Sequence, residues 1–167
     1  MLNKLWSKIR KKSEPRYDLK YLSGIEMFHK LNDNELLQLS DMFIDKHYTK
    51  DEIIFRENYP SVVIYIVFKG SVKLYTDTSS SEYEVFIGEM KPQMVFGELG
   101  IFSEINRQVS AVALEDTHLL AINKTDFINY VKSNPGTGIK LLWNLGRAIT
   151  RDFKNEIEKL RDYESKK

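Results

Sequence analysis

The hydrophobic period of the chain changes twice along its length, and this limits the fold more than any other feature. Between residues 52 and 122 the apolar residues gather in short segments rich in β-branched and aromatic side chains, separated by turn residues. The segments expected as strands are Glu52–Arg56, Val62–Phe68, Ser71–Asp77, Glu82–Gly88, Val109–Glu115 and His118–Ile122. Because most of them follow one another without a helix, they favour an antiparallel sandwich or barrel over an α/β sheet.

Helical spacing precedes the strands, over Tyr21–Ile44, where Asn32 or Asp33 is expected to cap a helix. Two turns are also predicted. Lys69–Gly70 separates two strong strands and indicates a tight hairpin in which the glycine adopts a positive φ. The polar run Thr78–Ser81 indicates a surface loop.

Helical spacing returns after the strands. A helix from about Thr125 to Lys132 is expected to end at Asn134, and Pro135 then begins a long helix. Its apolar positions alternate at four and three residues, interrupted at Glu156. They are Leu142, Gly146, Ile149, Phe153, Leu160 and Tyr163. This spacing predicts a homodimer through the C-terminal helix, and the alternative is a helix that lies across its own barrel.

Charge and cysteine content exclude several classes of protein. Twenty-five Lys and Arg against 24 Asp and Glu leave a net charge of +1, so no overall basic field is available for nucleic acid. The absence of cysteine excludes disulfides, iron–sulfur clusters and thiolate zinc sites. His29, His47 and His118 lack metal-ligand spacing, so no metal site is expected. No nucleophile elbow or phosphate-binding loop sequence occurs, and no catalytic residues are predicted.

The first 20 residues form a basic segment with seven Lys or Arg against two acidic residues. Leu2, Leu5, Trp6 and Ile9 would share one face of a short helix. One interpretation is peripheral membrane or partner contact through residues 1–12, with lysines toward anionic headgroups. The other, which we favour, is a helix that packs its apolar face on the domain.

The stretch that carries chemistry begins at Gly97–Glu98–Leu99, directly after an expected strand. One helical turn there would leave the backbone N–H groups of Glu98 and Leu99 free to bind an anion. Arg107 adds planar donors suited to a phosphate, and a carboxylate suits sugar hydroxyls. The residues therefore fit a nucleoside monophosphate, although a surface salt bridge between Glu98 and Arg107 would use the same pair.

As a set, these features resemble the cyclic nucleotide-binding domain family, of the type found in catabolite activator protein and protein kinase A regulatory subunits. The resemblance rests on Ile64–Tyr75, Phe96–Leu99, Arg107 and Asn134–Pro135. It implies an α+β fold, an antiparallel β-roll (jelly-roll) with N-terminal helices and a long C-terminal helix. It also implies that Glu98 accepts the ribose 2′-OH, and that Arg107 and the amides near Gly97 hold the cyclic phosphate of cAMP or cGMP.

Several positions depart from the family pattern. Gln108 and Val109 replace two small residues after the arginine, although Ser110 matches the hydroxyl position that follows. Asn58 stands where a turn glycine is common, and Lys91–Pro92–Gln93 replaces a Gly-Pro-Gly-like turn. A bulky Val109 would narrow the phosphate pocket, so the alternative to a sensor is a degenerate domain that binds no nucleotide and acts as a dimeric scaffold or adaptor.

The sequence thus predicts a cytoplasmic, non-enzymatic sensor of cyclic nucleotides without a DNA-binding domain. Its expected parts are the basic segment 1–20, a β-roll with flanking helices over 21–134 and the C-terminal helix 135–167. Thr150 and Arg151 are the candidates for contacts to the base. Output would pass through the C-terminal helix to a second copy, to an unknown downstream partner, or, with residues 1–12, to a membrane.

Overall fold

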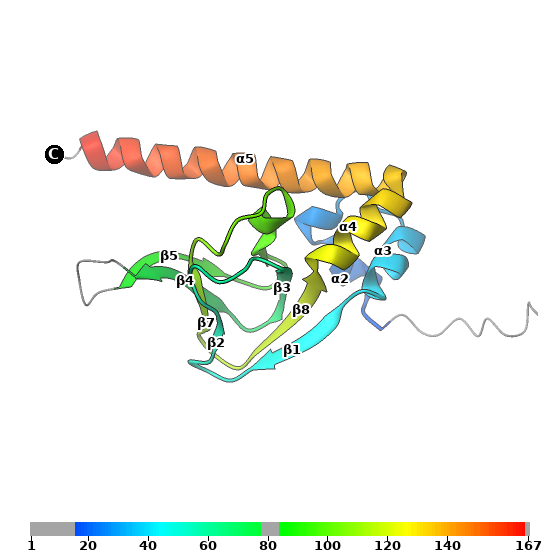
Figure 1. Cartoon of the computed structure of the whole chain (residues 1–167), viewed down its shortest axis with the longest axis horizontal. Helices are drawn as coiled ribbons and strands as arrows, with labels where there is room; N and C mark the ends of the chain where they lie inside the picture. Colours follow the sequence, from blue (N-terminus) through cyan, green and yellow to red (C-terminus); the bar gives the residue numbers. More distant parts are fainter. Residues whose placement is uncertain (1–15, 78–83, 166–167) are drawn as a thin grey trace, which may run out of the picture.

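Two four-stranded antiparallel sheets face each other and form the β-roll (Figure 1). The computed structural model describes residues 16–77 and 84–165. One sheet has the order β1-β8-β3-β6 and the other β2-β7-β4-β5. The strands are β1 (Ile44–Tyr48), β2 (Ile53–Phe55), β3 (Val63–Lys69), β4 (Val72–Asp77), β5 (Glu84–Met90), β6 (Val95–Phe96), β7 (Ser110–Ala113) and β8 (Thr117–Asn123). The six expected strands are all present, which confirms the antiparallel roll.

Turn residues set the geometry of the roll. Gly70 joins β3 to β4 with a φ of +85°, as expected for a tight hairpin. Asn58 and Gln93, which stand in place of family glycines, adopt φ values of +68° and +72°. Both are held by backbone hydrogen bonds, from the Asn58 N–H to the Arg107 carbonyl and from the Gln93 N–H to the Val67 carbonyl, each 2.8 Å long. The substituted turns therefore keep the left-handed conformation that glycine would adopt.

Strand β1 corrects the expectation of helix up to Ile44. Its five residues pair with β8 from Ile44 opposite Ala121 to Tyr48 opposite Thr117. The strand is polar and lies at an edge, so its sequence lacks the apolar alternation that marks a half-buried strand. The expected Thr78–Ser81 loop and the basic helix near the N-terminus lie outside the described residues.

The helices pack at one end of the roll, beside the sheet that contains β1, β8 and β3 (Figure 1). They are α2 (Leu19–Ser23), the 3₁₀ helix η1 (Glu26–Phe28), α3 (Asp33–Ser40), α4 (Lys124–Ser133) and α5 (Pro135–Ser165). Of the two residues expected to cap α3, Asn32 does so, and the structure adds a reciprocal capping box with Glu35. Asn134 ends α4 and Pro135 begins α5, also as predicted.

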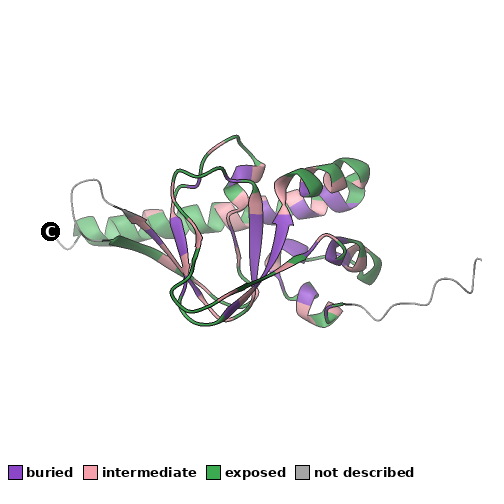
Figure 2. Cartoon of the chain, turned by 60° about the horizontal axis from the view of Figure 1, so that its bottom comes forward, coloured by how far each residue is buried: buried purple, intermediate pink, exposed green. Residues whose placement is uncertain are grey.

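The buried side chains form two cores (Figure 2). The larger core lies between the helices and strands β3 and β8, and it includes Phe28, Phe127 and Leu141. The smaller core fills the roll itself and includes Tyr65, Phe96 and Ala111. Because Tyr65 and Phe96 are adjacent in the β3–β6 register, the inner core reaches the strand that leads into the candidate site.

The first third of α5 is fastened to the helices beneath it. Leu141 and Leu145 are buried in the larger core, and the Asn144 amide donates to the carbonyl oxygens of Met27 and His29 at 3.1 and 2.8 Å. The Glu35 carboxylate of α3 accepts from the Lys140 ammonium and the Thr137 hydroxyl, both at 2.8 Å. These contacts fix the direction in which the remaining helix leaves the body.

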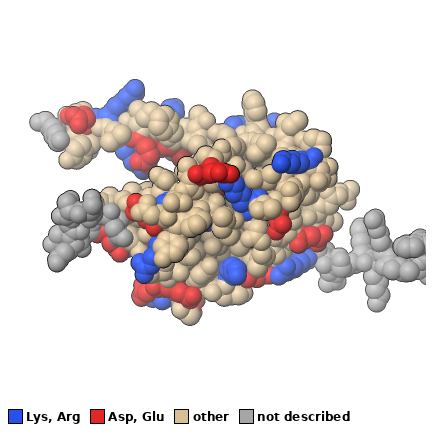
Figure 3. All heavy atoms as spheres, in the orientation of Figure 1, with Lys and Arg blue, Asp and Glu red and all other residues tan. Residues whose placement is uncertain are grey.

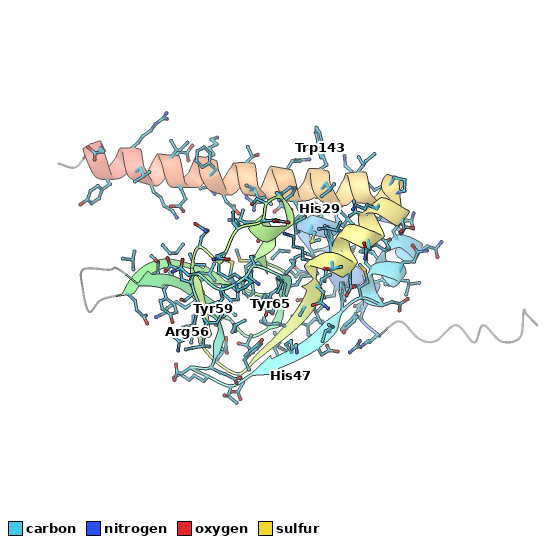
Figure 4. The ribbon with its side chains drawn as sticks, viewed as in Figure 1. His29, His47, Arg56, Tyr59, Tyr65 and Trp143 are labelled. Atoms are coloured by element: carbon cyan, nitrogen blue, oxygen red, sulfur yellow. The ribbon has the colours of Figure 1, made fainter. Side chains whose placement is uncertain are left out.

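The rest of α5 runs beyond this anchor in the same direction as the β4–β5 hairpin (Figures 1 and 2). At about 1.5 Å per residue, its 31 residues span roughly 46 Å. Trp143 projects from the helix away from the body (Figure 4). Leu142, by contrast, packs against the larger core, so it faces its own domain.

Acidic and basic side chains are both scattered over the face seen in Figure 3, which fits the absence of an overall basic field. In the part of the chain that the structure describes, no helix is both long and apolar enough to cross a bilayer.

The contact between Glu35 and α5 should contribute to stability in a way that depends on pH. Burial alone would raise the pKa of Glu35, but hydrogen bonds from Lys140, the Asn32 amide and Thr137 hold the pKa below the usual 4.5. The variant Glu35→Gln keeps the capping box but removes the charge, so it should lower the free energy of unfolding by about 1–3 kcal/mol at pH 7.

Urea unfolding at several pH values measures this difference. A lowered carboxyl pKa gives stability that is present above 4.5 and is lost as the pH falls through the folded value, so the deficit of the variant should shrink there. Glu156→Gln, on the exposed half of α5, should change stability by less than about 0.5 kcal/mol. A deficit that does not depend on pH would contradict the assignment.

Candidate functional site

The candidate site is the segment from Gly97 to Ala113, called the cassette here, which begins directly after β6 and ends with strand β7. Gly97 has a φ of +77°, a left-handed conformation that turns the chain out of β6 into the 3₁₀ helix η2 (Glu98–Ile101). A Cβ at Gly97 would collide with Nη1 of Arg107. The glycine is therefore required both by its backbone conformation and by the arginine beside it.

Arg107, within the cassette, is buried, with 5% of its surface exposed. Its Nη1 donates to the Gly97 carbonyl at 3.1 Å and its Nη2 to the Val63 carbonyl at 2.6 Å. The guanidinium carbon lies 4.1 Å from the centre of the Phe55 ring. The Arg107 side chain thus links the start of the cassette to the first residue of β3 and the last residue of β2.

No carboxylate within the described residues lies close enough to Arg107 to form a salt bridge with it. Its Nε is buried and has no hydrogen-bond partner among those residues. Burial lowers the pKa of Arg107, while Tyr65 and Glu98 raise it, and a guanidinium stays protonated under these influences. A buried cation with a donor to spare is a site suited to an anion.

Glu98 lies half-buried at the start of η2. Burial raises the pKa of its carboxyl, its own backbone N–H lowers it, Asp152 of α5 raises it further and Arg107 lowers it. The carboxylate and the guanidinium therefore influence each other without a direct ion pair. This arrangement excludes the simple surface salt bridge between Glu98 and Arg107 that the sequence left open.

Hydrogen bonds from the backbone of the loop between β2 and β3 hold the far end of the cassette. The Asn58 N–H donates to the Arg107 carbonyl at 2.8 Å, and the Arg107 N–H donates to the Tyr59 carbonyl at 2.7 Å. Ser110 is buried, with 1% of its surface exposed, and its hydroxyl accepts a hydrogen bond from the Glu57 N–H at 3.0 Å. The loop between β2 and β3 therefore positions both ends of the Arg107–Ser110 segment.

The remaining cassette candidates lie nearer the surface. Leu99 is 43% exposed, and Gln108 is exposed, with its side-chain amide donating to the Asn106 carbonyl. Val109 is half-buried. The structure thus brings Gly97, Glu98 and Arg107 together, with Ser110 beside them in the fold of the loop.

The candidates on α5 have other partners. The Thr150 hydroxyl donates to the Gly146 carbonyl in its own helix at 2.7 Å. Arg151 pairs with Glu26 of η1 and with Asp152. These contacts place Thr150 and Arg151 in the helix and in its attachment to η1.

Sequence reasoning did not identify Phe55 or Glu57. Phe55 pairs with Ala111 in the β2–β7 register, four residues beyond Arg107, and Glu57 accepts from the Thr76 hydroxyl at 2.6 Å. The pairing of β2 with β7 joins residues more than 50 positions apart, and no local motif indicates it.

The histidines give no metal site. The rings of His47 and His118 stack with their centres 4.3 Å apart, and His118 Nε2 lies 2.7 Å from Oδ1 of Asp45. Among the residues covered by the structure, no group of three or more His, Cys, Asp or Glu side chains is arranged to hold a metal ion.

Comparison with known proteins agrees with this geometry. Residues 45–134, more than half of the chain, match the family model of the cyclic nucleotide-binding domain. The chain is 29% identical over 128 residues to the cyclic AMP receptor protein of Thermus thermophilus, covering 77% of this chain and 59% of that protein.

Solved structures show the same fold. The catabolite activator protein of Thermus thermophilus superposes with a TM-score of 0.73 at 26% identity, covering 83% of this chain and 63% of that one. A cAMP-bound PfPKA-R structure gives a TM-score of 0.60 at 26% identity, covering 66% and 39% of the two chains. The chain therefore spans less than two thirds of each of these proteins.

The close approach of Gly97 and Arg107 can be tested by substitution. Gly97→Ala places a side chain in the left-handed region and against the guanidinium, so we expect it to cost about 1–3 kcal/mol of stability. Gly136→Ala is the control, because a Cβ there meets nothing within 4 Å. Chemical unfolding of both variants measures the difference, and equal stability would show that the cassette does not depend on this contact.

Proposed function

The chain belongs to the cyclic nucleotide-binding domain family, and from that premise we propose that it is a non-enzymatic, cytoplasmic sensor that binds cAMP or cGMP in the cassette. The observation that carries the proposal is the buried guanidinium of Arg107, which has no carboxylate partner among the described residues and an unpaired Nε. Burying such a charge is costly, and a phosphate supplies both the countercharge and the missing acceptor.

In the proposed complex, Arg107 binds the cyclic phosphate and the Glu98 carboxylate accepts the ribose 2′-OH. The backbone N–H groups near Gly97, together with Leu99, line the phosphate side. Gln108, Val109 and Ser110 form its other edge, and Val109 limits its width. Contacts to the base come from Thr150 or Arg151 when α5 closes over the site, after Arg151 has exchanged its contact with Glu26.

Isothermal titration with cAMP, cGMP and 2′-deoxy-cAMP tests this function. Arg107→Lys keeps a positive charge but loses the planar donors, so nucleotide affinity should fall by about 10- to 100-fold. Wild-type protein should prefer cAMP over the 2′-deoxy analogue, and Glu98→Gln should reduce that preference. Arg161→Lys, at the exposed end of α5, is the matched control and should bind as wild type does.

Ligand-free unfolding of each variant accompanies these titrations, because Arg107 also holds two backbone carbonyls. Ligand at 100 times its dissociation constant should add about 2.7 kcal/mol to the stability of the wild type. If millimolar cAMP and cGMP neither titrate nor stabilise the protein, the sensor function is wrong. A domain that binds no nucleotide and acts as a scaffold or adaptor would then account for the occupied Nη donors of Arg107.

We also propose that α5 joins two copies of the chain. Four large apolar side chains project from it, each 65–69% exposed, namely Ile139, Trp143, Phe153 and Leu160. With Gly146, Thr150 and Ile157 they follow an unbroken spacing of four and three residues. This register replaces the one expected from sequence, because Leu142 packs on its own domain.

The charges beside this seam favour a parallel pair. Lys140, Arg147, Lys154 and Arg161 all follow one flank of the seam at seven-residue intervals. In an antiparallel pair, the basic flanks of the two helices would face each other, whereas in a parallel pair each basic flank faces the opposite flank of its partner. Electrostatic repulsion therefore disfavours the antiparallel arrangement.

Sedimentation equilibrium can test the dimer. Phe153→Glu introduces like charges at the centre of the seam and should raise the dimer dissociation constant at least about tenfold. Asn155→Glu adds the same charge on the other side of the exposed half of α5 and should leave the association unchanged. A wild-type monomer at 100 μM (about 2 mg/ml for a chain of 19.6 kDa), or equal effects of the two variants, would contradict the proposal.

A further inference from the structure

Phe55 is the side chain on which the Arg107 guanidinium rests. The guanidinium carbon lies 4.1 Å from the centre of the Phe55 ring and 5.8 Å from that of Tyr65. The ring of Tyr65 stacks with those of Phe55 and Phe96 at centre distances of 5.8 and 5.3 Å, and the Phe55 and Phe96 rings are tilted to each other at 6.0 Å. We call these three residues the aromatic platform. Tyr65, labelled in Figure 4, lies within the roll.

Burial makes this contact a strong one. A cation over an aromatic face is attracted more strongly when water is excluded, and Arg107 is 5% exposed. Two carbonyl oxygens and the ring face thus offset the cost of burying the charge. Phe55 is held in turn by its place in β2, opposite Ala111 of β7.

An aromatic partner differs from a carboxylate partner in one respect that matters for binding. A carboxylate would neutralise the arginine and occupy its N–H groups, which lie in the plane of the guanidinium. A ring beneath the guanidinium carbon neither neutralises the charge nor accepts a hydrogen bond from the in-plane N–H groups in the way a carboxylate does. In Arg107 one in-plane donor is indeed unused, because its buried Nε has no hydrogen-bond partner among the described residues.

We propose that Phe55 is a positioning residue for anion recognition, holding the Arg107 guanidinium over its ring so that the Nε–H remains free for a phosphate oxygen. The inference rests on the proposed function, because the anion is the cyclic phosphate. It assigns to strand β2 a part in ligand binding. Phe55 itself acts only through Arg107.

Three substitutions separate positioning from simple packing. Phe55→Leu keeps an apolar side chain but removes the ring face, and Phe55→Tyr keeps the ring. Phe43→Leu is the control for lost core packing, because Phe43 is 3% exposed in the larger core, away from the platform. Dissociation constants for cAMP and cGMP are measured by titration calorimetry well below the unfolding temperature of each variant.

We expect Phe55→Leu to weaken nucleotide binding about tenfold or more, Phe55→Tyr to restore it to within about threefold of wild type, and Phe43→Leu to reduce stability without weakening binding. A second readout needs no ligand. The Nε–Hε signal of Arg107 in a ¹H–¹⁵N spectrum, assigned with Arg107→Lys, should carry a ring-current shift that Phe55→Leu removes and Phe55→Tyr keeps.

Different failures have different meanings. If wild type binds nucleotide and Phe55→Leu binds equally well, the positioning role is wrong while the proposed function stands. The same conclusion follows if Phe43→Leu weakens binding as much as Phe55→Leu does. It also follows if the chemical shift of the Arg107 Nε–Hε signal is unchanged in Phe55→Leu. If wild type binds no cyclic nucleotide, the proposed function fails and the role of Phe55 in it fails as well.

Discussion

The burial of one positive charge, on Arg107, is the constraint around which the cassette is arranged. The guanidinium satisfies the carbonyls of Gly97 and Val63, and the close approach to Gly97 excludes any side chain there. The backbone of Arg107 also holds the β2–β3 loop, through hydrogen bonds with Asn58 and Tyr59. Removing the arginine would leave buried acceptors unpaired, and removing the glycine would displace the arginine, so each requires the other.

This mutual dependence gives Arg107 two functions that a sequence motif does not separate. Part of its hydrogen-bonding capacity holds the cassette in the absence of ligand, and part stays unused at Nε. A residue that served only as a surface phosphate ligand would be exposed and solvated. The burial of Arg107 instead means that the guanidinium is held in place without a ligand, which in the proposed complex would lower the ordering cost of binding.

Much of the fold was predictable because it depends on local pattern. The change of hydrophobic period located the strand region, the Asn32 cap and Pro135 located helix boundaries, and Gly97 marked the turn into the cassette. Strand β1 was missed because an edge strand with polar residues lacks apolar alternation. The contact of Phe55 with Arg107 depends on pairing between β2 and β7, and the seam of α5 depends on which face its own domain covers. Both are long-range consequences of packing, which sequence spacing does not encode.

Glu98 couples the cassette electrostatically to α5. Burial is the largest cause that raises the pKa of the Glu98 carboxyl, and Asp152 on the exposed half of α5 raises this pKa further, while its own backbone N–H and Arg107 lower it. The cassette and the helix thus carry like charges that repel each other. A hydroxyl donated to Glu98 disperses the charge on that carboxylate, and a phosphate at Arg107 changes the field that opposes it. In the proposed complex, binding would therefore alter the electrostatic balance between cassette and helix. The contacts of α5 with the larger core lie in its first third, and the exposed ion pair between Arg151 and Glu26 attaches its middle. A helix whose core contacts lie at one end, and whose middle is held by an exposed ion pair close to the site, can change position without disturbing either core.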